Sequence, residues 1–330
     1  MATTTTKQPL VPVTILTGFL GAGKTTLLNR ILKEDHGHRI AVIENEFGEE
    51  GVDNELLLQE TGEQILEMNN GCICCTVRGD LVRILAELRR RRESGDARFD
   101  RVIIETTGLA DPSPVAQTFF IDDRIAEYYL LDAVITVVDA AHGGQQLDQH
   151  PEAQAQVGFA DRILLSKTDL VSAEQAGALK QRLAAINPRA PIRAARFGDA
   201  PIGEILDLKG FNLNAILDID PQFLTSDAHE HDDAVGSFVF RSNKAFDPVK
   251  LEEFLGGIVQ VYGTDLLRYK GVLYMKGSDR QTVFQGVHQM MGADFGRRWQ
   301  PGEKPSTKMV FIGRNLPRDM IVQGLQQCLS

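Results

Sequence analysis

The fold of this chain is decided by the stretch Val13-Thr14-Ile15-Leu16-Thr17-Gly18-Phe19-Leu20-Gly21-Ala22-Gly23-Lys24-Thr25-Thr26. It begins with an apolar run typical of a buried strand and continues with a glycine-rich turn. After Thr26, apolar residues recur at helical spacing up to Leu32. The residues that match the phosphate-loop pattern G-x-x-x-x-G-K-S/T are Gly18, Gly23, Lys24 and Thr25. A strand, a glycine-rich loop and a helix in this order predict nucleotide binding.

The glycines of this loop let the backbone curl so that its N–H groups point at a polyphosphate, and the helix N-terminus adds a positive dipole. We expect Lys24 to reach the β- and γ-phosphates and the Thr25 hydroxyl to hold Mg²⁺. The residues expected to contact the nucleotide in this stretch are Gly18, Gly21, Ala22, Gly23, Lys24, Thr25 and Thr26. The alternative is a chance glycine-rich turn, which does not account for the strand before it and the helix after it.

The composition restricts the classes of protein to which the chain can belong. Its 330 residues predict more than one domain, and its formal net charge of −10 argues against a nucleic-acid partner, because phosphate backbones are bound by basic faces. No apolar stretch reaches transmembrane length, so we expect no membrane partner. Three of the four cysteines fall between Cys72 and Cys75, which is unlike a disulfide framework and favours a reducing cytoplasm.

Short β-rich runs alternate with helical segments from Val11 to about Ala195, which predicts an α/β P-loop NTPase domain over residues 11–205. The expected strands are Val13–Thr17, Arg39–Glu44, Arg101–Glu105, Ala133–Asp139, Arg162–Ser166 and Pro191–Ala195, and the expected helices are Lys24–Glu34, Asp80–Arg92 and Ala173–Ile186. Apolar strands separated by helices predict a parallel sheet with helices on both faces. Ligands of such sheets bind beyond the carboxyl ends of the strands, so residues at strand ends are the functional candidates.

The rest of the chain is expected to hold a second, smaller α+β domain over residues 236–330, after a linker over residues 206–235. The expected elements are the strands Ser237–Arg241, Gly271–Lys276, Thr282–Val287 and Lys308–Ile312 and the helices Pro248–Tyr262 and Pro317–Leu329. This order predicts a small antiparallel sheet with helices on one face. We expect residues 289–306 to be irregular and residues 1–10 to form a flexible tail.

Glu105 is expected to end a strand, directly before Thr106-Thr107-Gly108. A carboxylate in this place can hold a Mg²⁺-bound water or orient the attacking water, and the Gly108 N–H can contact the γ-phosphate and sense its loss. We therefore expect Lys24, Glu105 and Gly108 to serve catalysis and Thr106 to contact the nucleotide. The alternative is a strand-end glutamate in ordinary solvent.

The run Ser166-Lys167-Thr168-Asp169 follows another predicted strand. The Asp169 carboxylate can accept hydrogen bonds from guanine N1–H and the 2-amino group together, and adenine offers no such pair of donors. Asp169 would therefore select guanine, with the Lys167 stem over the base. Ser166 stands where the usual guanine motif has Asn, so one purine contact is weakened or lost. The alternative is a surface turn that caps the next helix.

Three thiols follow the glycine of Gly71-Cys72-Ile73-Cys74-Cys75 at a spacing that lets them converge on one soft metal ion. Zn²⁺ takes four tetrahedral ligands, which leaves one position for Glu44, Glu46, Glu49, a histidine or an incoming partner. Two alternatives are cysteines packed as small apolar residues and a redox-active thiol set. Adjacent Cys74 and Cys75 would form only a strained disulfide.

Two histidines in the linker, His229 and His231, lie among acidic residues. They can form a weak second metal-capture site, but a solvated acidic linker is the simpler interpretation.

The motifs together resemble one family, the CobW-type P-loop GTPases, and within it the YjiA-like branch. They are GFLGAGKTT at Gly18–Thr26, IENEFGE at Ile43–Glu49, GCICC at Gly71–Cys75, ETTGLADP at Glu105–Pro112, SKTD at Ser166–Asp169, LLRYKG at Leu266–Gly271 and MVFIG at Met309–Gly313. The resemblance implies a slow, metal-responsive GTPase and metallochaperone for Zn²⁺ or, in some branches, cobalt. It implies that Cys72, Cys74 and Cys75 bind the metal, with Glu44 and Glu49 as further ligands.

We therefore hypothesise that GTP–Mg²⁺ and the metal are coupled through the segment Glu44–Cys75, which joins the nucleotide site to the thiols. Hydrolysis would release this segment and pass Zn²⁺ to an unidentified client protein. One alternative is a regulatory switch that recruits a partner through the C-terminal sheet and holds only a structural metal. Another is an ATP-using kinase, against which Asp169 argues.

Overall fold

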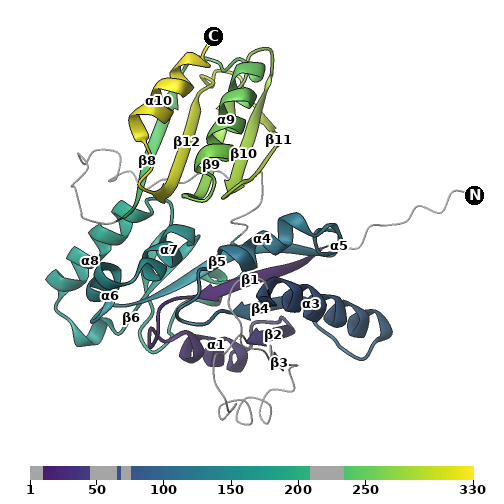
Figure 1. Ribbon diagram of the computed structural model, residues 1–330. Helices are drawn as coiled ribbons and strands as arrows, with labels where there is room; N and C mark the ends of the chain where they lie inside the picture. The colour runs from purple at the N-terminus through teal and green to yellow at the C-terminus, as the bar shows by residue number, and fades with distance from the viewer. Residues whose placement is uncertain (1–9, 45–64, 68–75, 209–233) are drawn as a thin grey trace, which may run out of the picture.

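The computed structural model describes residues 10–44, 65–67, 76–208 and 234–330, and two sheets organise this part of the chain (Figure 1). The strands of the first sheet are β1 Val11–Thr17, β2 Ile40–Glu44, β3 Ile65–Glu67, β4 Arg101–Glu105, β5 Tyr129–Asp139, β6 Arg162–Ser166 and β7 Ile192–Ala194. Their order across the sheet is β3-β2-β4-β1-β5-β6-β7, and every described pairing is parallel. This arrangement confirms the predicted parallel sheet.

Helices cover both faces of this sheet, as the apolar strands predicted. They are α1 Lys24–Lys33, α3 Thr76–Ser94, α4 Ser113–Ile121, α5 Asp123–Ala126, α6 Gly143–Gln149, α7 Pro151–Phe159 and α8 Ala173–Ile186, with short 3-10 turns at Thr168–Leu170 and Ile202–Glu204. Side chains alternate along each strand. Val102 and Ile104 of β4 therefore join the cluster beneath α3 and α4, whereas Ile103 faces α1. No helix in the described ranges is both long and apolar enough to cross a membrane.

The second sheet is antiparallel and has the order β11-β10-β9-β12-β8. Its elements are β8 Val235–Ser242, α9 Pro248–Tyr262, β9 Leu266–Tyr274, β10 Arg280–Val287, β11 Met290–Arg298, β12 Thr307–Arg314 and α10 Arg318–Gln327. Helices α9 and α10 lie on one face, as predicted (Figure 1). Successive side chains of β12 point to opposite faces of the sheet. Met309 and Phe311 lie in the cluster beneath these helices, whereas Val310 and Ile312 lie on the other face.

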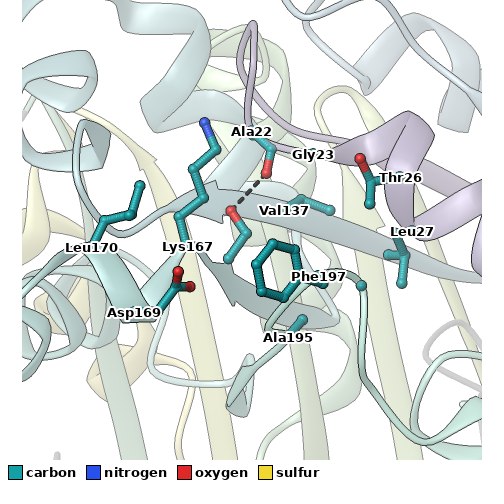
Figure 2. Close-up of a pocket in the computed structure, with 12 residues that line it drawn as sticks. Ala22, Gly23, Thr26, Leu27, Val137, Lys167, Asp169, Leu170, Ala195 and Phe197 are labelled. Carbon is teal, nitrogen blue, oxygen red and sulfur yellow. Dashed lines mark hydrogen bonds between the residues drawn. The ribbon is translucent and has the colours of Figure 1, made fainter.

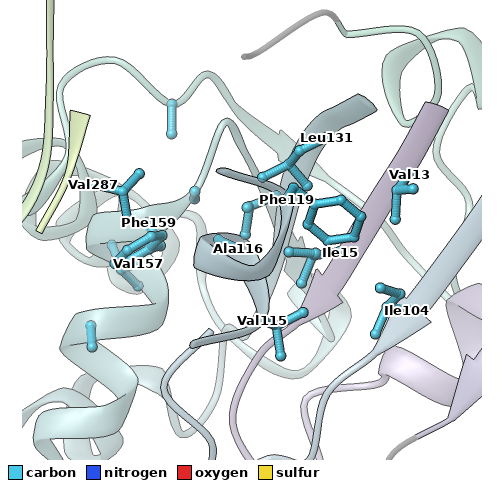
Figure 3. Packing of buried hydrophobic residues seen from close by; sticks show 14 of the residues in the cluster. Val13, Ile15, Ile104, Val115, Ala116, Phe119, Leu131, Val157, Phe159 and Val287 are labelled. Atoms are coloured by element: carbon cyan, nitrogen blue, oxygen red, sulfur yellow. The ribbon is translucent and has the colours of Figure 1, made fainter. Parts of the chain in front are cut away.

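That other face packs on the first sheet's helices, so one apolar cluster runs from β1 through α4 and α7 into the second sheet (Figure 3). Gly158 of α7 packs closely against the second sheet. A Cβ there would lie 3.0 Å from Leu267 Cδ1 and 3.3 Å from Ile312 Cγ2. The two sheets therefore share part of a core.

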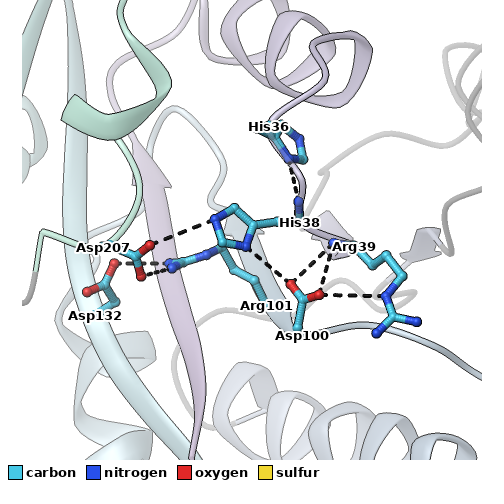
Figure 4. Close-up of polar contacts among 7 residues, drawn as sticks. All are labelled: His36, His38, Arg39, Asp100, Arg101, Asp132 and Asp207. Carbon is cyan, nitrogen blue, oxygen red and sulfur yellow. Dashed lines mark hydrogen bonds and ion pairs between the residues drawn. The ribbon is translucent and has the colours of Figure 1, made fainter.

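Several details differ from the expectations, which did not include β3 or the helices α4, α5, α6 and α7. Residues 289–306 were expected to be irregular, but Met290–Arg298 pairs with β10 as an edge strand. Most of its side chains are exposed, so its sequence lacks the apolar alternation that predicts a strand. Strand β9 begins at Leu266 instead of Gly271. The first residues of the expected linker pack on the first sheet. Leu206 is buried, and Asp207 forms an ion pair with the buried Arg101 (Figure 4). Arg101 also donates to Asp132 at 3.1 Å. The expected tail up to residue 9 and the segment 209–233 lie outside the described residues.

Candidate functional site

The phosphate-loop residues form a tight turn between β1 and α1. Gly18 has a φ of 143°, and a Cβ there would lie 2.2 Å from the Val137 carbonyl oxygen, so no larger residue fits. Lys24 opens α1 and reaches back over the loop, where its Nζ donates to the carbonyls of Gly18 at 2.9 Å and Phe19 at 3.3 Å. The backbone N–H groups at the start of α1 and the lysine thus share one small region. This arrangement suits a polyphosphate.

Glu105 lies beside this loop at the end of β4. The Thr25 hydroxyl donates to Glu105 Oε1 at 3.1 Å. Glu105 is also in register with Leu16 of β1 and with Glu44 of β2, so the strand that carries Glu105 lies between the phosphate-loop strand and Glu44. The side chain of Glu44 is buried. A hydroxyl and a carboxylate oxygen this close provide the hard oxygen donors that Mg²⁺ prefers.

The segment after β4 packs directly on the phosphate loop. A Cβ on Gly108 would lie 2.6 Å from the Leu20 nitrogen, so this backbone contact requires glycine. Thr106 is buried, and its hydroxyl donates to Thr17 Oγ1 at 2.8 Å, which ties the ends of β4 and β1 together. The carbonyl of Gly108 accepts a hydrogen bond from Gln156 of α7 at 3.0 Å.

The residues at the end of β6 line a cavity of about 330 Å³ beside the phosphate loop (Figure 2). Its lining comprises Ala22, Gly23, Thr26, Leu27, Val137, Ser166, Lys167, Asp169, Leu170, Ala195, Phe197 and Gly198. Ser166 Oγ donates to the Ala22 carbonyl at 2.6 Å, so the residue that replaces the expected Asn contacts the loop. Asp169 Oδ1 lies 3.7 Å from Arg196 Nε. The cavity has the lining and position expected for a base next to bound phosphates.

Two residues of this site were missed by the sequence analysis. Phe197 lines the cavity with its side chain exposed, at the turn that follows β7. Asp139 ends β5, and its carboxylate accepts a hydrogen bond from Lys167 Nζ at 2.8 Å. Asp139 is the last residue of β5 and Phe197 lies shortly after the end of β7, so the strand-end criterion applied to β4 and β6 would also have found them.

Burial by itself would raise the pKa of the Asp139 carboxyl. Hydrogen bonds from Lys167, His142 and the Ala141 N–H outweigh burial and hold this pKa below its usual value. Asp139 is therefore a buried anion at neutral pH, with Lys167 as its counter-ion.

Two family models match the chain. Residues 12–194 match the CobW/HypB/UreG nucleotide-binding domain, and residues 235–329 match the C-terminal domain of the cobalamin synthesis protein cobW. The chain belongs to the CobW/HypB/UreG family.

Individual members of the CobW/HypB/UreG family align with nearly the whole chain. This chain is 44% identical to the zinc chaperone YjiA of Escherichia coli (strain K12). The alignment spans 312 residues and covers 94% of this chain and 96% of YjiA. The chain is 37% identical to the zinc chaperone CobW of Pseudomonas aeruginosa, with 97% and 92% covered. The crystal structure of Zn(II)-bound YjiA GTPase from E. coli matches with a TM-score of 0.83 and 38% identity, and covers 98% of this chain and 100% of that one. These matches confirm the predicted family and fold.

The thiol motif of this CobW/HypB/UreG member, Cys72, Cys74 and Cys75, lies outside the described residues, as do Glu49, His229 and His231. Among the residues that the structure does describe, no group of three or more His, Cys, Asp or Glu side chains is placed to hold a metal ion. The elements on either side of the motif are described. Strand β3 ends at Glu67, in register with Glu44, and α3 begins at Thr76.

Proposed function

We propose that this chain is a metal-responsive GTPase that acts as a zinc chaperone. It would hydrolyse GTP to GDP and phosphate and couple this cycle to binding Zn²⁺ and transferring it to a client protein. The observation that carries the proposal is the register of Glu44 with Glu105 in neighbouring strands. It puts a candidate metal ligand one strand away from the residue that contacts Thr25 of the phosphate loop. The relatives named zinc chaperones and the zinc-bound GTPase structure support the choice of metal.

The catalytic part of the proposal rests on the contacts of the phosphate loop. The loop N–H groups and Lys24 bind the β- and γ-phosphates, where Lys24 stabilises the charge that develops during transfer. Thr25 would hold Mg²⁺, which supplies further neutralisation of the phosphate charge. Glu105 would hold a Mg²⁺-bound water or orient the attacking water. Gly108 packs on Leu20 of the loop and senses the γ-phosphate.

Recognition of the base is assigned to the cavity after β6. Asp169 accepts the paired N–H donors of guanine, and the Lys167 stem covers the base. Arg196, which lies 3.7 Å from Asp169, would give up this ion pair when guanine binds. Its exposed position makes that exchange inexpensive, because surface ion pairs contribute little.

Zinc is the cargo, and we assign it to Cys72, Cys74 and Cys75 with Glu44 or Glu49 as the fourth ligand. Strand β3 ends at Glu67, at the carboxyl edge of the sheet and in register with Glu44. The three cysteines follow shortly after Glu67 in the sequence. Thiolate ligands have to stay reduced, so the proposal places the protein in the cytoplasm. A change at the γ-phosphate would then alter the metal site through β4 and β2.

The test is a zinc titration in the presence of a non-hydrolysable GTP analogue or of GDP. We expect different zinc affinities in the two states and, by linkage, the same factor in nucleotide affinity with and without zinc. Glu44→Gln should weaken zinc binding, whereas Glu93→Gln, an exposed change on α3, should not. Equal zinc affinities in both nucleotide states would overturn the coupling. A Cys74→Ser variant that retains its GTPase rate and partner binding would favour a regulatory switch with a structural metal.

A further inference from the structure

The carboxyl end of β5 lies between the two parts of the nucleotide site, because β5 pairs with the phosphate-loop strand β1 on one side and with β6 on the other. Its last residue, Asp139, is 2% exposed. Oδ1 accepts hydrogen bonds from the N–H groups of Ala141 at 2.8 Å and His142 at 3.3 Å. Oδ2 lies 2.8 Å from Lys167 Nζ and 3.0 Å from His142 Nδ1. Groups of the turn that follows β5 thus bind both oxygens of the carboxylate, in addition to its contact with Lys167.

Lys167 is the residue that this carboxylate restrains. It has a φ of 53°, in the left-handed region that non-glycine residues seldom adopt, and it directly precedes the 3-10 turn that carries Asp169. Figure 2 shows its side chain extended along the cavity, with the ring of Phe197 also facing the cavity. A free lysine side chain samples many rotamers, and ordering it on ligand binding costs entropy. Anchoring Nζ on Asp139 orders the side chain before any ligand arrives.

We propose that Asp139 is the positioning residue of the purine site, which holds the Lys167 stem in place as a wall for the base. The inference rests on the proposed function, because it assumes that this cavity binds the base of a nucleotide. Asp139 does not contact the hydrogen-bonding edge of the base in this scheme, so it contributes equally to any purine nucleotide. Asp169, in contrast, distinguishes guanine from purines that lack the 2-amino group.

The experiment measures the dissociation constants of GDP and of inosine diphosphate, which lacks the 2-amino group, for Asp139→Asn, Lys167→Met and the double variant. We expect Asp139→Asn to weaken both nucleotides equally, by about ten-fold, which is the effect of one lost charge-assisted hydrogen bond. Lys167→Met retains an apolar stem but loses the anchor, so it should weaken both to a similar degree. Adding Asp139→Asn to Lys167→Met should cause no further loss. The matched control is Asp148→Asn on α6, which weakens the ion pair between the exposed Asp148 and Arg182 of α8 and should leave both constants unchanged.

The outcomes separate the inference from the proposed function. If Asp139→Asn weakens binding equally with and without Lys167, or has no effect, Asp139 does not act through Lys167 and the inference is wrong. If Asp139→Asn does not fold, Lys167→Met alone decides, and wild-type affinity in that variant overturns the inference. Asp169→Asn tests the assignment of the base site itself. It should weaken GDP more than inosine diphosphate, and equal affinities would remove the guanine site on which the inference rests.

Discussion

At the scale of single residues, the contact between Gly108 and the phosphate loop leaves no room for a side chain. The backbone after β4 approaches Leu20 so closely that a Cβ on Gly108 would lie 2.8 Å from the Leu20 Cα. Real Cβ atoms essentially never come this near to backbone atoms, so the two segments can touch only through glycine. This contact brings the segment proposed to sense the γ-phosphate against the loop proposed to bind it.

Gly108→Ala should push these segments apart. We expect the GTP hydrolysis rate to fall by about ten-fold or more, equivalent to about 1.4 kcal/mol in activation free energy. GDP affinity should change little, because the base cavity and the loop N–H groups are intact. Single-turnover hydrolysis and GDP titration measure the two effects. Gly177→Ala on α8, where a Cβ would meet nothing within 4 Å, is the control and should leave both unchanged. A normal hydrolysis rate in Gly108→Ala would contradict the proposed contact.

At the scale of elements, α7 connects the nucleotide site to the second sheet. Its Gln156, 1% exposed, donates from Nε2 to the carbonyls of Gly108 and Ala110, both at 3.0 Å. Two residues earlier, Gln154 accepts a hydrogen bond from the Val235 N–H at the start of β8. Asn187 Nδ2 lies within hydrogen-bonding distance of three carbonyls at the end of the same helix. Buried amide groups therefore hold both the middle of this helix and its C-terminal end.

Gln156→Leu removes one of these amides and leaves the buried Gly108 carbonyl and the part-buried Ala110 carbonyl without this donor. We expect a loss of about 1 to 3 kcal/mol in the free energy of unfolding, because unsatisfied buried polar groups are costly. GTP hydrolysis should also slow, since the segment at Gly108 loses its support. Chemical denaturation measures the first effect. The same substitution at the exposed Gln181 of α8 should change neither quantity, and an unaffected stability in Gln156→Leu would show that the contacts with Gly108 and Ala110 contribute nothing.

At the scale of the whole molecule, the two sheets are joined by a shared core and a buried ion pair. Arg268 of β9 donates to Asp161 Oδ1 at 2.6 Å and to the Phe159 carbonyl at 2.9 Å. Both charged side chains are almost completely buried. A surface pair would contribute little, but a buried charge that loses its partner is strongly unfavourable.

Arg268→Met should therefore cost about 3 to 5 kcal/mol, because it leaves Asp161 buried without this partner. It should also loosen the attachment of the second sheet to α7, which amide hydrogen exchange along β8 and β9 would detect. Arg298→Met provides the contrast, since Arg298 and Asp279 form an exposed pair at 3.3 Å and the change should cost under about 1 kcal/mol. Similar losses in the two variants would rule out a special role for the buried pair.

A histidine at the same junction, His288, whose ring centroid lies 5.8 Å from that of Phe159 in α7, should make stability depend on pH. Burial lowers the pKa of His288 below its usual 6.5, and Arg314 lowers it further, while Asp111 and the carbonyls of Gly263 and Thr264 oppose the shift. The unfolded chain then binds more protons than the folded one just below pH 6.5, so the free energy of unfolding decreases as pH falls through this window. His288→Asn, which tolerates the φ of 51°, should flatten the dependence when denaturation is followed from about pH 7 to pH 5. An unchanged slope would assign the dependence to other groups.

The sequence alone determined what depends on neighbouring residues. The phosphate loop, the strands ending at Glu105 and Ser166, and helices such as Ala173–Ile186 follow from local periodicity, turn chemistry and capping, and these were predicted with few errors. The family followed from the same local motifs. Edge strand β11 was missed because exposed strands lack the apolar alternation on which such predictions depend.

Tertiary structure decided which of these local elements meet. That Glu44 lies in register with Glu105, that Asp139 anchors Lys167, and that Gln156 supports Gly108 all depend on the order and register of strands and helices far apart in the chain. Side-chain patterns show which face of a strand is buried but not which strand lies beside it. The phosphate loop identifies a nucleotide site by itself because its hydrogen-bonding groups are consecutive residues. The base cavity and the link to the second sheet exist only after folding, because their parts come from different strands and helices.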